Sequence, residues 1–281
     1  MLFFDDRDER DPVRGDRRID WLKSVGARPL SSAKSNESGF LFAGARPMED
    51  YRKLVGPLLG MRDRAEEREP LLRLDAVLSA LHAVGVEVPL PQTWTLNLDA
   101  AIPADIRYPL FLRTPLSSWK LGGRISKVRT EAQLREEAEN LRRAFGWDCP
   151  VLAREWVELR EVGSSVYGPV PCEIRVWVVD GQPAAWSFHY LNVVSKPEGF
   201  PPGPEDLRTL SKIAASVATA FKSRLVVVDV AKRKKGGWVM IEAGPGSCAG
   251  TAHEIVFRHV CSRLRGETSA SSGDDVGGPL T

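Results

Sequence analysis

The sequence predicts an α+β protein, in which a pair of lobes built on antiparallel strands follows a small α/β region. Residues 173–179 and 182–191 alternate in polarity around the turn pair Asp180-Gly181, which predicts a hairpin. A second pair of apolar runs, 225–230 and 238–243, flanks the turn KRKKGG. Because hairpins join these strands, the pattern favours a pair of α+β lobes over a repeated βαβ array.

Regular patterns also extend through the first half of the chain. Apolar residues at a 3.6-residue period predict helices, and apolar runs bounded by proline or glycine predict strands. In chain order, we expect an apolar run at 39–44, helices at 48–59 and 69–84, strands at 93–98, 109–113 and 124–128, and a polar, glycine-ended loop at 114–123.

Helices are expected in both lobes. A capping box that begins at Thr130 opens a helix reaching Phe145, and residues 204–223 carry another apolar stripe at helical spacing. The glycine-bearing loop 245–250 is followed by a second capping box at Thr251, which opens a last helix to about residue 265.

Composition shifts divide the chain into five parts. The first residues are densely charged and the last are rich in Gly, Ser and Asp, so neither end is expected to bury much apolar surface. We therefore expect a flexible charged leader at 1–18, an N-terminal α/β region at 19–104, a small lobe at 105–157, a large lobe at 158–265 and a disordered tail at 266–281.

Overall composition is that of an ordinary globular protein. Of the 281 residues, 43% are hydrophobic and 27% charged, which excludes wholesale disorder. The 39 Lys and Arg against 37 Asp and Glu leave a net charge of +2, too balanced for the broad positive field of a nucleic-acid-binding protein. A nucleic acid partner is therefore not expected, although a local basic cleft stays compatible with this balance.

The four cysteines, Cys149, Cys172, Cys248 and Cys261, stand singly and lack the spacing of a metal site. No apolar run approaches the roughly 18 residues of a membrane span, and the first residues are acidic where a signal peptide is basic. These features predict reduced cysteines, no membrane partner and a cytoplasmic location.

Two acids interrupt otherwise apolar strands. Asp229 lies in VVVDV and Glu242 in VMIEA, and an unpaired buried carboxylate costs several kcal/mol. On adjacent antiparallel strands their oxygens could share a hard cation such as Mg²⁺. The alternative is a pair of structural salt bridges to basic residues.

Cations surround the first predicted hairpin. Arg113 ends one strand and Lys120 lies in the loop beyond it, so both could reach an anion above the hairpin. Lys127 is a weaker candidate, and solvated surface cations are the alternative. The loop lacks the spacing of a Walker phosphate loop.

Glu173 and Arg175 occupy alternate positions of one strand and so share a face, where they could form an ion pair or frame a charged ligand. No Ser, Cys or Thr stands in a recognisable nucleophile elbow. The histidines, His82, His189, His253 and His259, have no metal-ligand spacing.

Taken in order, these residues resemble the nucleotide-binding core of ATP-grasp proteins over about residues 88–262. The resemblance is strongest to the divergent clade named for one arginine and two lysines, carried by PLFLR, EIRVWVVDG, VVVDV, VMIEA and GPGSCAG. It implies a two-lobed ATP-grasp fold that grips ATP between antiparallel sheets.

The resemblance also implies roles for individual residues. Arg113 matches the cation on the α-phosphate, Lys120 a phosphate-contacting lysine, and Lys127 is the candidate for the second lysine. In the clade's E-x-R strand, Glu173 is a cofactor-binding residue and Arg175 faces the phosphates or the substrate. The interlobe hinge whose backbone meets adenine corresponds to Glu155, Trp156 and Val157, and the metal-binding acids to Asp229 and Glu242.

One position departs from the family. Where an Asn commonly follows the metal-binding Glu by two residues, this chain has Gly244, which has no side-chain ligand. The resemblance thus predicts an ATP- and Mg²⁺-dependent, ADP-forming ligase that activates a carboxylate as an acyl phosphate for an amine or other nucleophile, on a peptide or protein among other acceptors.

Two alternatives stay open. Gly244 favours an ATP-binding assembly factor or chaperone that performs no ligation. The basic turn KRKKGG at 232–237 would suit a phosphotransferase or ligase acting on RNA ends, although an exposed hairpin turn also explains it.

Overall fold

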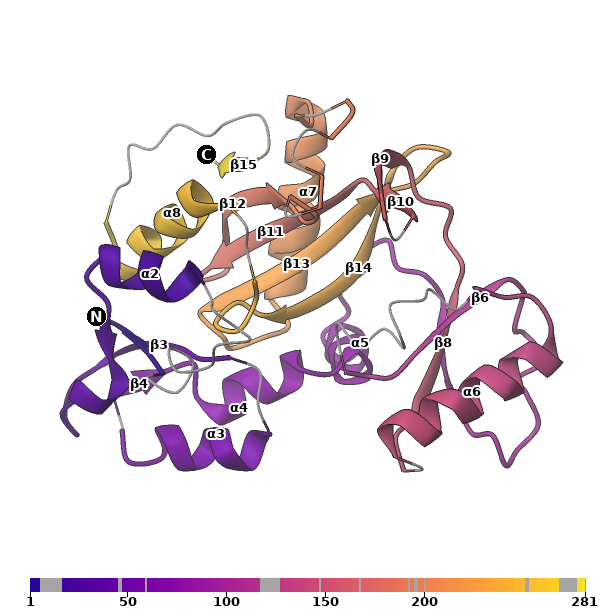
Figure 1. The fold of residues 1–281 in the computed structure, drawn as a ribbon, viewed down its shortest axis with the longest axis horizontal. Coiled ribbons are helices and arrows are strands. Elements are labelled where there is room, and N and C mark those ends of the chain that lie inside the picture. Colours follow the sequence, from indigo (N-terminus) through magenta and orange to yellow (C-terminus); the bar gives the residue numbers. More distant parts are fainter. Residues whose placement is uncertain are drawn as a thin grey trace.

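The computed structural model describes residues 1–5, 17–44, 47–58, 60–116, 127–146, 148–166, 168–191, 193–194, 197–199, 201–250, 253–267 and 277–280. These residues form a parallel N-terminal sheet, a small antiparallel sheet and a larger antiparallel sheet, each covered by helices (Figure 1). The mixed α+β fold class expected from the sequence is confirmed.

The N-terminal sheet has the strand order β2-β1-β3-β4, and its strand pairs are parallel. Phe3 and Leu41 lie in a buried cluster with residues of the neighbouring helices, whereas Phe4 and Phe42 lie in a second cluster on the other face of the sheet. The elements are β1 (Leu2–Phe4), α2 (Arg17–Ser24), β2 (Arg28–Pro29), β3 (Gly39–Phe42), α3 (Met48–Val55), β4 (Met61–Arg62) and α4 (Ala65–Arg68).

The prediction of a flexible leader at 1–18 is wrong for its first residues. Leu2, Phe3 and Phe4 are at most 2% exposed and form the strand between β2 and β3. Their burial depends on strands that arrive about 25 and 40 residues later, which a three-residue apolar run does not reveal.

The small lobe is a four-stranded sheet in the order β5-β8-β6-β7, covered by one helix whose apolar stripe packs on it. Thr130 caps this helix by accepting a hydrogen bond from the Gln133 amide, as predicted. The elements are β5 (Thr93–Leu96), β6 (Leu110–Arg113), β7 (Lys127–Val128), α6 (Glu131–Phe145) and β8 (Val151–Glu155).

The expected boundary at residue 104 needs correction, because β5 pairs with β8 and so belongs to the small lobe. The preceding helix α5 (Leu74–Ala83) packs Val77 and Leu81 into the core of the large lobe. The segment 19–104, assigned to one N-terminal region, therefore supplies strands to the N-terminal sheet and to the small lobe, and a helix to the core of the large lobe.

The large lobe is a five-stranded antiparallel sheet in the order β14-β13-β11-β12-β15. Helix α7 packs on one face, and α8 packs on the other together with the N-terminal elements. The elements are β11 (Glu173–Val179), β12 (Gln182–Phe188), α7 (Pro204–Ala218), β13 (Leu225–Lys232), β14 (Trp238–Pro245), α8 (Glu254–Arg265) and β15 (Gly277–Pro279). A separate hairpin, β9 (Glu161–Ser165) and β10 (Gly168–Pro171), lies between the lobes in the sequence.

Two hairpins of this sheet agree with the sequence. Asp180 and Gly181 both have positive φ, +50° and +77°, which is what a two-residue hairpin turn of this kind requires. The strands β13 and β14 pair so that Asp229 lies directly opposite Glu242.

Two other expectations at the C-terminal end differ from the structure. Gly277–Pro279, within the tail expected to be disordered, forms β15 and pairs with β12. The cap of α8 is His253, whose ring nitrogen accepts from the Val256 amide, while Thr251 lies outside the described residues. Within the described ranges, no helix combines the length and the apolar character needed to cross a membrane.

Candidate functional site

One face of the large sheet changes from apolar to charged along its strands. Cross-strand register places Arg175, Asp229 and Glu242 in a single row over β11, β13 and β14. Two residues away on the same face, Trp177 and Val227 are buried in the apolar cluster under α8. The sequence therefore concentrates charge at one end of a face whose other end is core.

Arg175 and Asp229 form a buried bidentate ion pair. The Nε and Nη2 atoms of Arg175 donate to the two carboxylate oxygens of Asp229 over 2.8 and 2.7 Å, and Nη1 donates to the Gly250 carbonyl. Burial by itself lowers the pKa of Arg175, but the adjacent Asp229 carboxylate more than offsets this and raises that pKa. Arg175 is thus a permanent cation that fixes the orientation of Asp229.

Glu242 is held by a cation from the other lobe. Arg113 at the end of β6 donates from Nη1 to Glu242 Oε2 over 2.9 Å, while its Nε and Nη2 donate to the carbonyls of Thr114 and Leu116, each over 3.2 Å. Both candidate metal acids therefore face an arginine, which is the arrangement the salt-bridge alternative expected. The Arg113–Glu242 pair also bridges the lobes.

Arg154 on β8 is a site residue that the sequence reasoning missed. It is 3% exposed, donates from Nη1 to the Ile241 carbonyl over 2.7 Å and from Nε to the Thr93 hydroxyl over 3.2 Å. Its Nη2 has no hydrogen-bond partner among the described residues. Burial, and then repulsion from Arg113, lower the pKa of Arg154 to about 9, although Glu242 opposes the shift.

A bulge in the large sheet explains how Arg154 reaches across. The β13–β14 register shifts between Asp229 and Val230, so that Ile241 is the extra residue of β14. A bulged residue is left outside the ladder, and its carbonyl is free to accept from the small lobe. The signal for Arg154 in the sequence is an arginine inside the apolar run VLAREW.

Of these groups, Arg113, Arg154 and Glu242 line a cavity of about 460 Å³ between the lobes, whereas Arg175 and Asp229 are not among its lining residues. Its walls include all three residues expected at the hinge. The amides of Glu155 and Trp156 donate to the carbonyls of Gln92 and Pro109, whereas the Val157 amide has no backbone hydrogen bond within the described ranges. The lining residues with a charged or aromatic side chain are Phe111, Arg113, Arg154, Glu155, Trp156, Glu158, Glu161, Glu173, His189, Tyr190 and Glu242.

Lys127 lies at the edge of this cavity, against its hinge. Its Nζ is 2.8 Å from Glu158 Oε1 and 4.4 Å from the centre of the Trp156 ring. The Trp156 indole N–H donates to the same Glu158 oxygen over 2.8 Å. The cation that Lys127 offers is therefore partly neutralised by Glu158. Lys120, the other predicted lysine, lies outside the described residues.

Two residues before Arg175 on the same face of β11, Glu173 is contacted by two residues that follow β12. The Tyr190 hydroxyl donates to Glu173 Oε2 over 3.2 Å, and burial, followed by the Glu173 charge, raises the pKa of Tyr190. The His189 ring lies 3.8 Å from an oxygen of Glu173 and 3.8 Å from an oxygen of Asp229. The sequence did not indicate a role for His189, because the residues near it are distant in the chain.

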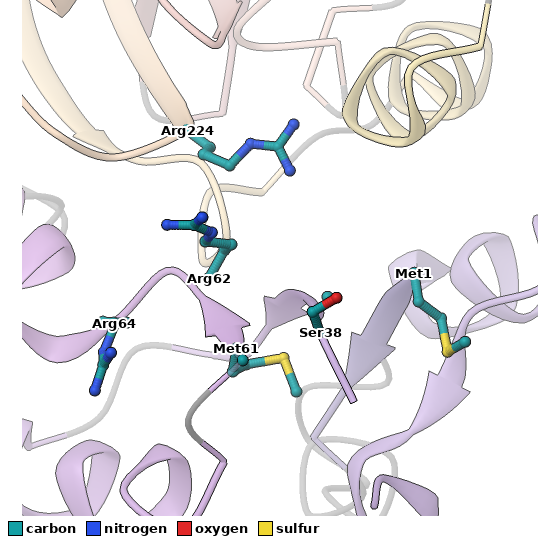
Figure 2. Close-up of a pocket in the computed structure, with 8 residues that line it drawn as sticks. Met1, Ser38, Met61, Arg62, Arg64 and Arg224 are labelled. Atoms are coloured by element: carbon teal, nitrogen blue, oxygen red, sulfur yellow. The ribbon is translucent and has the colours of Figure 1, made fainter. Parts of the chain in front are cut away.

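A second cavity of about 360 Å³ lies elsewhere, between the N-terminal sheet and the start of β13. Arg62, Arg64 and Arg224 lie around it together with Ser38 (Figure 2). None of the site residues expected from the sequence lines this cavity. Of the two cavities described, the first is the one lined by residues expected at the site, among them Arg113, Glu173 and Glu242.

The comparison with protein families decides which group this arrangement belongs to. The matching model describes an ATP-grasp domain, family 3 of the clade named for one arginine and two lysines, and it covers residues 96–264, more than half of the chain. The chain belongs to this family. The matched range includes most of both lobes and every site residue expected from the sequence.

Solved structures share the fold of this ATP-grasp chain. A RimK domain protein ATP-grasp from Sphaerobacter thermophilus has a TM-score of 0.61 at 14% identity, covering 94% of this chain and 98% of its own. N5-carboxyaminoimidazole synthase from Aspergillus clavatus, solved with ADP and 5-aminoimidazole ribonucleotide, has a TM-score of 0.63 at 11% identity, covering 95% and 77%.

D-alanine–D-alanine ligase from Bacillus anthracis, solved with ATP, has a TM-score of 0.62 at 15% identity, covering 95% of this chain and 96% of its own. At these identities the similarity establishes the ATP-grasp fold of the chain. No curated protein matches the sequence.

Proposed function

We propose that this ATP-grasp protein is an ATP- and Mg²⁺-dependent, ADP-forming ligase. The observation that carries the proposal is the cavity between the lobes, where buried Arg113 and Arg154 lie with Glu242, the residue that pairs across the strands with Asp229. Structures of the same fold hold ADP or ATP. A cavity of about 460 Å³ is within the ordinary size range of small-molecule sites.

The hydrogen-bond donors of the cavity fit a nucleoside triphosphate. Arg113 and Arg154 supply fixed cations for phosphate oxygens, and the Arg154 Nη2 is a buried donor with no partner in the described structure. Burying such a donor without an acceptor costs about 1–3 kcal/mol, which a phosphate oxygen would recover. Lys120 and Lys127 are assigned to the same phosphates, and the Val157 amide to the adenine edge.

The acids fit a hard divalent cation. Asp229 and Glu242 lie opposite each other on adjacent strands, and carboxylate oxygens are the ligands that Mg²⁺ prefers. The ion would supply charge neutralisation between the phosphates and the two carboxylates. Nucleotide binding would then draw Arg113 from Glu242 to a phosphate, leaving the Glu242 oxygens for the ion.

The reaction follows from positioning and charge. A substrate carboxylate oxygen attacks the γ-phosphorus, the bond to the β-γ bridging oxygen breaks, and ADP leaves. An amine then attacks the acyl carbon and inorganic phosphate leaves. Arg175, with Lys120, would stabilise the transferred phosphoryl group through its remaining N–H groups, while holding Asp229 in place. The carboxylate and its acceptor, among which a peptide or protein fits the proposal, are not specified by the site.

Isothermal titration with a nonhydrolysable ATP analogue, with and without Mg²⁺, tests the proposal. We expect micromolar, Mg²⁺-dependent binding that Arg154→Gln weakens about 10- to 100-fold, because a charge-assisted hydrogen bond contributes about 1.5–3 kcal/mol. The matched control is Arg143→Gln, an exposed arginine on α6 of the same lobe. Equal affinity in the three proteins, or no binding, would refute the site.

A nucleotide-binding assembly factor without ligase activity is the second candidate. Two observations favour it, the absence of a ligand side chain at Gly244 and the arginine on each candidate metal acid. Release of ADP separates the two candidates. Tight analogue binding together with no ADP formed from ATP over hours in a cell extract, which supplies substrates, would select the assembly factor.

A further inference from the structure

The second cavity, of about 360 Å³, is lined by arginines as its only charged side chains. Arg62 comes from β4 and Arg64 from the residue before α4, whereas Arg224 precedes β13 of the large lobe. Figure 2 shows the side chains of Arg62 and Arg224 extending into the space between the N-terminal sheet and the large lobe, and Arg64 pointing away from it. Two cations from separate parts of the fold therefore meet at this cavity.

The two cations differ in the partners that they have. Arg224 donates from Nε and Nη2 to the two carboxylate oxygens of Asp180, each over 2.6 Å, and Nη2 also donates to the Leu264 carbonyl. Its Nη1 has no hydrogen bond to another of the described residues. The side chain of Arg62 forms neither a hydrogen bond nor an ion pair within the described ranges. Both guanidinium groups therefore keep donors that can bind a ligand.

The acids at the start of α4 have other partners. Glu66 lies 3.1 Å from the Nε atom of Arg64. The Oε2 atom of Glu67 accepts from the amides of Asp63 and Arg64, over 2.9 and 3.1 Å. Neither glutamate forms an ion pair with Arg62, so the charge of Arg62 has no bound acid in the described part of the chain.

Close backbone contacts hold the floor of the cavity in place. A Cβ at Gly39 would lie 2.7 Å from the Phe3 ring, which packs against this backbone. A Cβ at Gly60 would lie 2.6 Å from the Glu37 carbonyl oxygen. The Gly39 amide donates to the Gly60 carbonyl over 3.3 Å. The backbone next to Arg62 is thus fixed before a ligand arrives, which lowers the entropy lost on binding.

The chemistry of these donors suits a phosphate group. A guanidinium presents paired N–H donors that match two phosphate oxygens, and Ser38 adds a hydroxyl to the same cavity. Because a phosphate offers several acceptor oxygens and up to two negative charges, it satisfies two guanidinium groups better than a carboxylate does. The volume of about 360 Å³ is in the ordinary range of small-molecule sites.

We propose that Arg62 and Arg224, with the Ser38 hydroxyl, bind a phosphate dianion that is either free or carried by a small ester. The inference does not depend on the proposed ligase function, because none of these residues lines the cavity between the lobes. The bound anion would join β4 to the start of β13, the strand that carries Asp229. It would therefore stabilise the contact between the N-terminal sheet and the large lobe.

Isothermal titration of inorganic phosphate tests the site, with the cavity between the lobes first filled by the nonhydrolysable ATP analogue. We expect saturable binding with a dissociation constant of about 1 mM or lower. Arg62→Gln should weaken it about tenfold or more because a charge-assisted hydrogen bond is lost, and Arg62→Lys should weaken it less because the charge remains. Arg62 is exposed, so both variants should fold. The matched control is Arg52→Gln, which removes an arginine of α3 that is 53% exposed and does not line the cavity.

Glycerol 3-phosphate, a small phosphate ester, distinguishes the two sources of the anion. An affinity equal to or higher than that of inorganic phosphate assigns the site to an ester. Weaker or absent binding of the ester, with inorganic phosphate bound, assigns it to the free ion.

The outcomes separate this inference from the proposed function. No saturable heat up to about 10 mM phosphate, or equal affinities in Arg62→Gln and Arg52→Gln, would overturn the phosphate site. Phosphate binding that Arg154→Gln removes and Arg62→Gln retains would place the anion between the lobes and overturn it as well. If the analogue does not bind, the proposed function fails, and phosphate titrations of Arg62→Gln and Arg52→Gln without the analogue still decide the inference.

Discussion

Replacing Asp229 by asparagine should destabilise the protein far more than the loss of one surface charge would. The side chains of Arg175 and Asp229 are 10% and 3% exposed and are joined by two charge-assisted hydrogen bonds of 2.8 and 2.7 Å. Asparagine offers a single acceptor, and its amide N–H groups would face those of Arg175. The guanidinium would then remain buried without a counter-charge.

The magnitude follows from that burial. Removing one partner of a buried ion pair costs about 3–5 kcal/mol, most of it the desolvation of the charge left behind. With about 2 °C or more per kcal/mol for a chain of this size, the melting temperature should fall by at least about 6 °C. Arg175→Met combined with Asp229→Leu should recover most of this loss, because replacing both members by apolar groups is often nearly neutral.

Differential scanning fluorimetry without nucleotide measures the effect, and Asp180→Asn is the matched control. Asp180 forms the same bidentate pair with Arg224, but their side chains are 50% and 32% exposed, so its loss should cost about 1 kcal/mol or less. The reasoning would be refuted if Asp229→Asn and Asp180→Asn melted within about 2 °C of each other, or if the double variant were less stable than Asp229→Asn.

Two further predictions concern Asp63 in the N-terminal region and the loop that follows β14. Burial raises the pKa of Asp63 to about 6 against the opposing charge of Arg68, so the folded state binds this proton more tightly than the unfolded state. The free energy of unfolding should therefore rise by about 1 kcal/mol between pH 7 and pH 5 because of Asp63, and this gain is lost as pH rises through 6. Urea melts of the wild type and of Asp63→Asn at both pH values check this. An equal change of unfolding free energy with pH in the two proteins would contradict it. In the loop after β14, a Cβ at Gly246 would lie 2.4 Å from buried Leu225, whereas one at Gly250 would meet nothing within 4 Å. Gly246→Ala should thus lower the free energy of unfolding by about 1–3 kcal/mol, and Gly250→Ala by much less, as measured by thermal melts. Similar losses in the two variants would contradict this, because they would show that the loop can shift to make room for the added Cβ.

Local patterns predicted the elements whose cause is local. The β11–β12 hairpin needs only alternation and a turn pair that tolerates positive φ, and both are visible in the sequence. The α6 helix likewise follows from its cap and stripe. The row of Arg175, Asp229 and Glu242 was partly predictable as well, because charged residues inside buried strands must find partners or ligands.

The features that were missed depend on contacts between distant segments. Leu2–Phe4 forms a strand by pairing with β2 and β3, and Gly277–Pro279 forms one by pairing with the edge of β12. Arg154 contacts the bulge at Ile241, 87 residues later, and His189 lies near Glu173 and Asp229, which come from different strands of the sheet. The residue pattern within one segment cannot predict contacts between segments that are distant in the sequence.

The short strand at the C-terminal end also has a consequence for self-association. Without β15, the Ala185–Ser187 edge of β12 would present unpaired amides and carbonyls, a template on which a strand of another copy could pair. β15 occupies that edge, and because Pro279 has no amide hydrogen, the new outer edge is a poorer template than the one it covers. A chain that is shortened before residue 277, or fused there to a tag, would expose the β12 edge and would pair more readily with strands of other molecules.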